Sequence, residues 1–167
     1  MRILAFLIIS YLILNPRSWV ISNLDLNQTP YFSYFLNKSE VLNRFEINPP
    51  NLYLTIYLKN QAYFSENGTI VLMLNFDDLI QSEDIGDVMF FHELGHYVSY
   101  MKNSSFDKNS EEIFADLFSV KMTNLSVFCE VLKKSNPEPD NSHLSAQDRC
   151  DMFQNENNSL EDIIRRL

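Results

Sequence analysis

Two of the three histidines in this chain lie four residues apart, in the run His92-Glu93-Leu94-Gly95-His96. The residues around that run predict a helix over 88–101, because the apolar ones fall near one helical face. Side chains four residues apart on a helix stand one above the other, so both imidazoles point in the same direction. Any fold of this chain must therefore place a helix that combines an apolar face with a pair of histidines. The apolar residues are Phe91, Leu94, Val98 and Met101.

The same run fits the pattern H-E-x-x-H, in which two helical histidines bind zinc and the glutamate between them acts as a base. The ring nitrogens of His92 and His96 can both reach one Zn²⁺ at about 2.0–2.1 Å. Glu93 projects beside the metal, where it can accept a proton from a zinc-activated water. We therefore predict a Zn²⁺ cofactor, His92 and His96 as ligands, and Glu93 as the catalytic general base. Two surface histidines on an amphipathic helix are the alternative interpretation.

Zinc needs a third protein ligand and an open position for water or substrate. Lys102 occupies the position six residues after His96, where one zinc-protease pattern has a third histidine. A glutamate from the following helix is the other solution. The segment from His96 to Glu112 holds 15 intervening residues, which allows one helix to end, a short loop to form and another helix to begin.

A second helix is predicted from about Ser110, the candidate N-cap, through Met122. Glu111 and Glu112 both lie in its first turn. Asp116 decides between them, because it lies four residues after Glu112 on the same face and can accept a hydrogen bond from a ligand imidazole. We predict that Glu112 is the third ligand and that Asp116 supports a ligand histidine. Glu111 is then explained by the helix dipole, which favours acidic residues at this end.

The third histidine, His143, lies six residues before Arg149 in a polar segment. A hydrogen-bond donor near the metal can stabilise the oxyanion of a tetrahedral intermediate. His143 is our catalytic candidate for that role, and Arg149, Tyr97 and Tyr100 are further candidates. In the structural interpretation, His143 and Arg149 cap and pin the last helices. Both interpretations stay open for the histidine, and the structural one is favoured for the arginine.

The glycine at position 95, in the middle of a predicted helix, requires an explanation from packing. Glycine inside a helix costs about 1 kcal/mol relative to alanine. We expect another backbone to approach the helix closely at this position.

The remaining patterns predict an α+β fold with one small antiparallel or mixed sheet, packed on the H-E-x-x-H helix and followed by the glutamate-bearing helix. The strand over 69–76 is almost continuously apolar, as central strands are. It is also expected at the rim of the cleft, where an extended substrate adds as a further strand if the edge is free. The expected segments are a helix over 31–47, strands over 52–58 and 69–76, a turn at 66–68, a loop over 136–141, and short helices over 144–153 and 160–167.

The chain has 167 residues, the size of one domain. Arg2 and the apolar run over 3–14 are typical of an export signal and short for a membrane span. We expect residues 1–22 to be a signal peptide or N-terminal anchor, residues 23–167 to form a single domain, and the protein to be exported. The net charge of −9 and the lack of a basic stripe argue against a nucleic-acid partner. Apart from that anchor, we expect no membrane partner.

Two interpretations of the cysteines stay open. In an oxidising compartment Cys129 and Cys150 can form one disulfide. The alternative is two small buried apolar side chains. Neither cysteine lies at metal-ligand spacing from a histidine.

The H-E-x-x-H helix and the following E-x-x-A-D pattern resemble the gluzincin metallopeptidases. A more specific resemblance is to an uncharacterised bacterial family classed as metallopeptidases, which has counterparts of four segments of this chain. The resemblance implies a zincin-like fold and zinc-dependent peptidase activity, and it implies nothing about the substrate. The four segments are Ala62-Tyr63-Phe64 before Ile70-Val71-Leu72, the run His92 to His96, the set Glu111, Glu112, Ala115 and Asp116, and the set Asp140, His143 and Arg149.

We therefore expect a zinc-dependent endopeptidase or peptidase that hydrolyses a peptide or protein substrate through a metal-activated water. The alternative is a zinc-binding module without turnover, acting as an inhibitor, an immunity protein or a structural protein. A deformylase-like hydrolase is disfavoured, because position 95 is glycine and neither cysteine is placed as a ligand.

Overall fold

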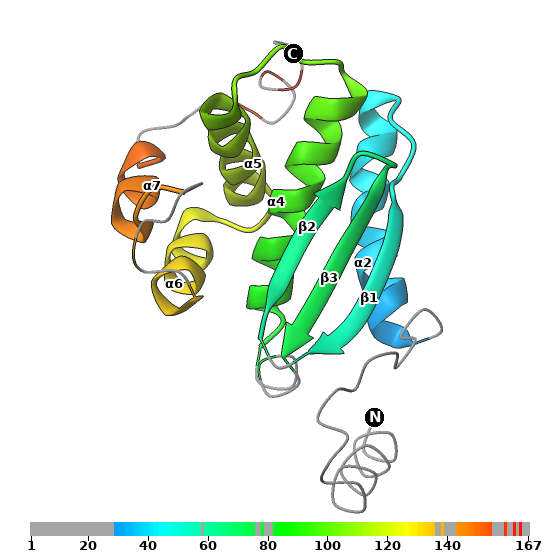
Figure 1. Cartoon of the computed structure of the whole chain (residues 1–167), viewed down its shortest axis with the longest axis horizontal. Coiled ribbons are helices and arrows are strands. Elements are labelled where there is room, and N and C mark those ends of the chain that lie inside the picture. Colours follow the sequence, from blue (N-terminus) through cyan, green and yellow to red (C-terminus); the bar gives the residue numbers. More distant parts are fainter. Residues whose placement is uncertain are drawn as a thin grey trace, which may run out of the picture.

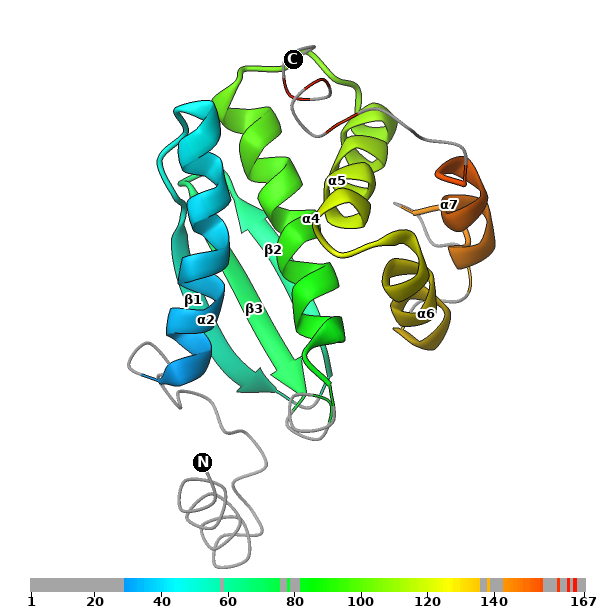
Figure 2. The same ribbon diagram turned by 180° about the vertical axis from the view of Figure 1, so that it is seen from behind.

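The computed structural model describes residues 29–57, 59–75, 82–135 and 143–154, with single positions at 78, 138, 159, 162 and 164. These residues form an α+β fold in which helices cover one face of a small mixed sheet, as predicted (Figures 1 and 2). The predicted signal or anchor over 1–22 lies outside the described residues. Among the described residues, no helix is both long and apolar enough to cross a membrane.

The sheet has three strands, β1 (Asn51–Tyr57), β2 (Gln61–Ser65) and β3 (Thr69–Asn75). Their order is β1-β3-β2, with β3 parallel to β1 and antiparallel to β2. The predicted central position of β3 and the predicted turn before it are confirmed, and Gly68 adopts the positive φ of 81° that this turn requires. The condition for substrate addition along β3, a free edge, is not met, because β1 and β2 pair along its two sides. Sequence patterns missed β2, which has five residues, none of them buried.

The predicted first helix is confirmed as α2 (Pro30–Ser39), which continues as the 3₁₀ helix η2 (Glu40–Phe45). Thr29 caps α2 by accepting a hydrogen bond from the Phe32 N–H over 3.4 Å, and Pro30 suits the first helical position. The buried face of α2, which carries Phe35 and Ser39, packs against β1 and the central helix.

That central helix, α4 (Asp84–Met101), lies across the sheet and carries the histidine run. It begins at Asp84, four residues before the predicted start. The earlier turn is stabilised by packing, since Gly86 lies so close to Phe35 that a Cβ there would meet the ring at 2.9 Å. Leu94 and Val98 are fully buried in the core, as the apolar face predicts.

The glutamate-bearing helix, α5 (Lys108–Met122), packs along α4. Its N-cap is Asp107 and not the predicted Ser110, because the Asp107 carboxylate accepts the Ser110 N–H over 2.9 Å and so caps the helix one turn earlier. The close backbone approach predicted at Gly95 is confirmed. A Cβ at Gly95 would lie 2.6 Å from the Ala115 Cα atom of α5.

Two further helices, α6 (Leu125–Ser135) and α7 (Ala146–Met152), complete the described fold. Sequence patterns did not predict α6 as a separate helix, whereas α7 falls within the range predicted for a short helix. Cys129 of α6 and Cys150 of α7 form a disulfide, which selects the first of the two interpretations of the cysteines. Most of the predicted loop over 136–141 and of the predicted helix over 160–167 lies outside the described residues.

Candidate metal centre

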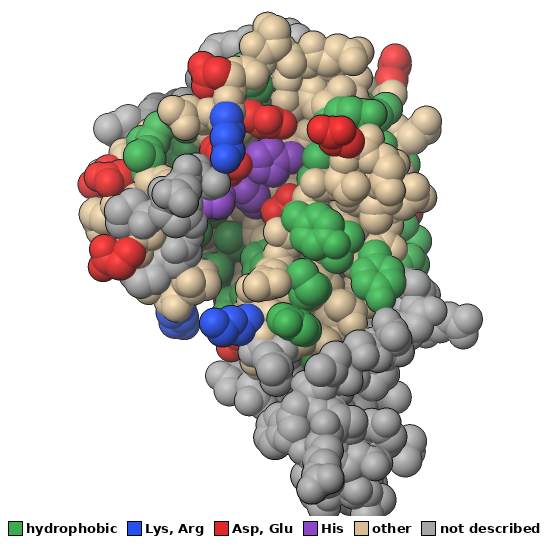
Figure 3. Space-filling view, in the orientation of Figure 1, with side chains coloured by type: hydrophobic (Ala, Val, Ile, Leu, Met, Phe, Trp, Pro, Cys, Tyr) green, Lys and Arg blue, Asp and Glu red, His purple; other side chains and the backbone are tan. Residues whose placement is uncertain are grey.

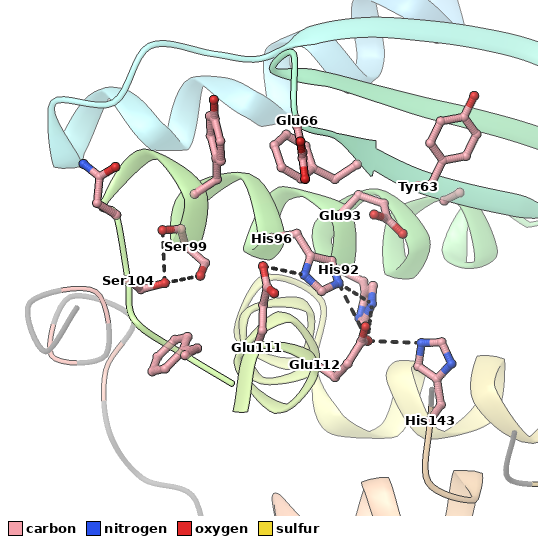
Figure 4. Close-up of a pocket in the computed structure, with 15 residues that line it drawn as sticks. Tyr63, Glu66, His92, Glu93, His96, Ser99, Ser104, Glu111, Glu112 and His143 are labelled. Atoms are coloured by element: carbon pink, nitrogen blue, oxygen red, sulfur yellow. Dashed lines mark hydrogen bonds and ion pairs between the residues drawn. The ribbon is translucent and has the colours of Figure 1, made fainter. Parts of the chain in front are cut away.

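A cleft of about 710 Å³ opens between β2, the second half of α4 and the start of α5. Figure 3 shows the histidines gathered in this hollow with acidic side chains around them. Figure 4 shows that the labelled side chains of α4 and α5 point toward one another, with His143 entering from the segment before α7. The fold therefore brings four separate parts of the chain to one place.

The three predicted metal ligands converge at one point. The Nε2 atoms of His92 and His96 are 3.2 Å apart. Oε2 of Glu112 lies 3.4 Å from the first nitrogen and 3.7 Å from the second. Ligand atoms at 2.0–2.1 Å from a tetrahedral zinc are about 3.3–3.4 Å from one another. The triangle thus has the size that a single zinc ion requires.

Glu112 itself tests whether a cation fits here. Its Oε2 atom is buried, which is costly for an ionised group without strong partners, and the Nε2 atoms of His143, His92 and His96 lie 3.1, 3.4 and 3.7 Å from it. Burial would raise the pKa of Glu112, but the imidazoles of His143, His92 and His96 hold it well below its usual range. Two imidazoles and an ionised carboxylate form a donor set that zinc favours, so these residues fit the predicted metal.

Asp116 lies directly behind His92, as its spacing from Glu112 predicted. The His92 Nδ1–H donates to Oδ1 of Asp116 over 2.9 Å, which leaves the Nε2 lone pair free to face the other ligands. The Arg149 Nε donates to Oδ2 of Asp116 over 2.7 Å, and its Nη2 donates to Oδ1. Burial would raise the pKa of Asp116, but His92 and Arg149 together lower it. A buried ion pair therefore orients His92, the first predicted ligand.

These contacts favour the charged form of His92 in the metal-free protein. Burial alone lowers the pKa of this histidine. The hydrogen bonds to Asp116 and Glu112 outweigh that effect and raise the pKa of His92 to about 10. Metal binding at this site must therefore displace a proton.

Glu111 has a contact that the sequence interpretation missed. Its Oε1 atom lies 3.5 Å from Nδ1 of His96, on the side of the ring away from the other ligands (Figure 4). Each histidine of the run thus has a carboxylate near its Nδ1 atom. The available signal was the place of Glu111 beside Glu112 in the first turn of the same helix, which we attributed to the helix dipole alone.

Glu93 lies in the cleft between the histidines and the sheet, with 7% of its surface exposed. Burial raises its pKa, while His92 and His96, and a hydrogen bond from the Phe64 backbone of β2, act in the opposite direction. A carboxylate with a raised pKa accepts and returns a proton near neutral pH more readily than an exposed one does. This position agrees with what a general base needs.

His143 reaches the same group of ligands. Its Nε2 atom lies 3.1 Å from Oε2 of Glu112. Ligand atoms of His92, Glu112 and His143 all lie within 4.8 Å of one another. His143 can therefore either act on a reacting oxygen or supply a fourth ligand, and both roles remain open.

Of the other three candidates for the oxyanion role, only Tyr100 lines the cleft, since Tyr97 and Arg149 form hydrogen bonds outside it. The Tyr97 hydroxyl donates to the Asn48 carbonyl over 2.8 Å, outside the cleft, so Tyr97 is not available for that role. Arg149 is occupied by Asp116, which agrees with its structural interpretation. Tyr100 lines the cleft and is 47% exposed.

Comparison with known proteins does not identify a family for this chain. No protein-family model matches the chain, and neither a curated protein nor a solved structure is significantly similar to it. Function is therefore argued from the residues of the site.

Proposed function

We propose that this chain is a zinc-dependent peptidase of the gluzincin type, built on a zincin-like domain and acting on a peptide or protein substrate. The observation that carries the proposal is the triangle of His92, His96 and Glu112 ligand atoms beside the buried carboxylate of Glu93. The order of elements supports it, since an H-E-x-x-H helix packs on a mixed sheet and precedes a glutamate-bearing helix.

His92, His96 and Glu112 would hold the zinc ion. When bound, zinc lowers the pKa of a water molecule toward about 7 and polarises a substrate carbonyl. The surrounding carboxylates prepare the site for the ion. Asp116 fixes the tautomer of His92, and Glu111 faces the corresponding nitrogen of His96.

The chain's own residues move the proton. Glu93 accepts it from the attacking water and delivers it to the leaving amine, so that the peptide bond breaks without releasing an unprotonated amine. Burial of Glu93 suits this exchange, because it raises the pKa of the carboxyl group. In this proposal His143 donates a hydrogen bond to the oxygen that becomes negative.

The substrate is proposed to lie along β2. Ala62, Tyr63 and Phe64 line the cleft, and within the described chain β2 pairs with another strand on one side only. An extended peptide can add to such an edge through main-chain hydrogen bonds. The site of addition is thus β2, in place of the strand over 69–76 that the sequence suggested.

The proposal includes export. The Cys129–Cys150 disulfide supports it, because such bonds persist in oxidising compartments and are rare in reducing ones.

One observation favours a second candidate, a zinc-binding module without turnover. With His143 as a fourth ligand, the metal would have four protein donors, and closed four-ligand sites are typical of structural zinc. His143→Ala separates the two functions. A peptidase with His143 as helper keeps its zinc and loses activity, whereas a structural site loses zinc affinity and has no activity to lose.

The experiment that tests the proposal measures zinc content and casein cleavage for the chain and for Glu93→Gln. We expect about one zinc per chain in both proteins and cleavage by the first alone. Zinc in both with cleavage by neither would favour the non-catalytic module. The absence of stoichiometric zinc would contradict the assignment of the three ligands.

A further inference from the structure

A second hollow of about 370 Å³ adjoins the cleft and shares two of its lining residues, Glu66 and Tyr100. It lies between the segment before β1, the turn from β2 to β3, and the end of α4. Its other walls combine the apolar surfaces of Pro49, Pro50, Tyr97 and Met101 with the polar residues Asn51 and Asn67 and with Gly68. The two hollows therefore form one continuous surface on which a chain leaving the metal centre can lie.

The walls of this second hollow are held in place. The Tyr97 hydroxyl donates to the Asn48 carbonyl, which fixes the proline segment against α4. The Asn51 N–H donates to the Gly68 carbonyl over 3.0 Å, and the Gly68 N–H donates to the Ser65 carbonyl over 2.9 Å. The hollow is thus formed before any ligand arrives, which reduces the entropy cost of binding.

The charge that lines the second hollow is negative. Glu66 is its only charged residue among those described, and neither a lysine nor an arginine of the described chain lines either hollow. Glu66 is exposed, and none of the described residues forms a hydrogen bond or ion pair with its side chain. Figure 4 shows it on the sheet side of the cleft, across from Glu111 on the helix side.

We infer that the second hollow is a subsite for a basic side chain, lysine or arginine, of a bound peptide. This inference rests on the proposed peptidase function, which it refines by naming the substrate class. The hydrocarbon stem of such a side chain packs on proline, methionine and tyrosine surfaces while its charged end remains near water. Glu66 supplies the opposite charge, and the Tyr100 ring supplies a face that attracts a cation.

The test uses zinc-loaded Glu93→Gln protein, because a chain without the proposed general base should retain bound peptides intact. Casein peptides produced by a glutamate-specific protease are passed over this protein, and the retained fraction is identified by mass spectrometry. The same capture is repeated with Glu66→Gln and Glu66→Lys added. Glu40→Gln is the matched control, because Glu40 is an exposed glutamate of η2 outside both hollows.

We expect lysine- and arginine-containing peptides to be enriched by the parent and by the Glu40 control. Glu66→Gln should reduce that enrichment about fivefold, the effect of one partly exposed ion pair, and Glu66→Lys should abolish it. Retention without basic enrichment, or enrichment unchanged by Glu66→Lys, would overturn the subsite.

The proposed function is judged separately by casein cleavage with the unmodified chain. Cleavage that occurs with no dependence on Glu66 leaves the peptidase and removes the subsite. Glu66-dependent capture without any cleavage leaves a basic-peptide site and removes the peptidase.

Discussion

The candidate metal centre is built from two regions that are held together in different ways. In the α4–α5 pair, Gly95 brings two backbones into contact, and the Ser119 hydroxyl donates to the Val88 carbonyl over 2.9 Å. The α6–α7 region packs on Val88 of α4 and Val120 of α5 through a second, smaller apolar cluster. It is tied to α5 by the buried Arg149–Asp116 ion pair and closed internally by one disulfide.

This difference separates two tasks. The α4–α5 contact sets the distances among the three proposed ligand atoms, so a change there displaces the candidate centre itself. The α6–α7 region supplies Arg149 and His143, which reach the ligands from outside. We therefore expect changes in α6–α7 to alter the affinity of the centre while leaving its three ligands in place.

The largest effect on metal binding is expected for Gly95→Ala. The new Cβ would meet the Ala115 Cα at 2.6 Å, and a backbone atom cannot move aside without separating the helices. Overpacking typically costs about 1–3 kcal/mol, and here it should also displace Glu112, so that stoichiometric zinc is lost. Zinc analysis and thermal unfolding measure both effects. Gly86→Ala is the control in the same helix, since its contact is the edge of the Phe35 ring. An equal loss of zinc in both variants would contradict this account.

The next effect is expected for Arg149→Met, which breaks the tie between the two regions. Asp116 would remain buried with His92 as its remaining partner, and breaking a buried ion pair typically costs about 3–5 kcal/mol. Loss of support behind a ligand histidine lowers metal affinity about 10–100-fold. Chemical unfolding and zinc titration provide the readouts.

Lys134→Met controls for the loss of a cation, because Lys134 forms its ion pair with Glu130 on the exposed face of α6. We expect little change in that variant. Similar losses in the two variants would show that the buried tie has no special role.

A smaller effect is expected from removing the disulfide with Cys129→Ser and Cys150→Ser together. The bond joins residues 21 positions apart, and closing a loop of that size stabilises a chain by about 3 kcal/mol. Because the three ligands lie outside α6–α7, zinc stoichiometry should remain near one per chain while unfolding occurs at lower denaturant concentration. Complete loss of zinc would show that the two regions are not separable.

The smallest effect concerns the proton on His92, where the two regions meet. The pKa of this histidine is raised to about 10 without metal, so zinc must displace a proton throughout the neutral range. Affinity should therefore increase with pH, about tenfold per unit between pH 6 and 8. Zinc titration by calorimetry in buffers of different ionisation enthalpy measures the released proton. An affinity that does not change over this range would show that His92 is already neutral.

Local patterns predicted the parts of the site that lie within one helix. The period of the α-helix fixes how residues four apart are placed, so the paired histidines and the Glu112–Asp116 relation followed from spacing. The same logic predicted the buried face of α4 and the close approach at Gly95. It failed at the start of α5, where Asp107 supplies a carboxylate cap one turn before Ser110.

The sequence by itself thus determined which side chains share a helical face, because that depends only on local backbone geometry. Only the tertiary structure decided which other parts of the chain pack against those helical faces. Arg149 and Asp116 are 33 residues apart, β2 takes the edge by pairing with β3, and Glu66 joins the two hollows through the turn that follows β2. Such contacts depend on the packing of the whole chain, since loop paths and helix positions are selected by buried area and polar pairing, which no short pattern encodes.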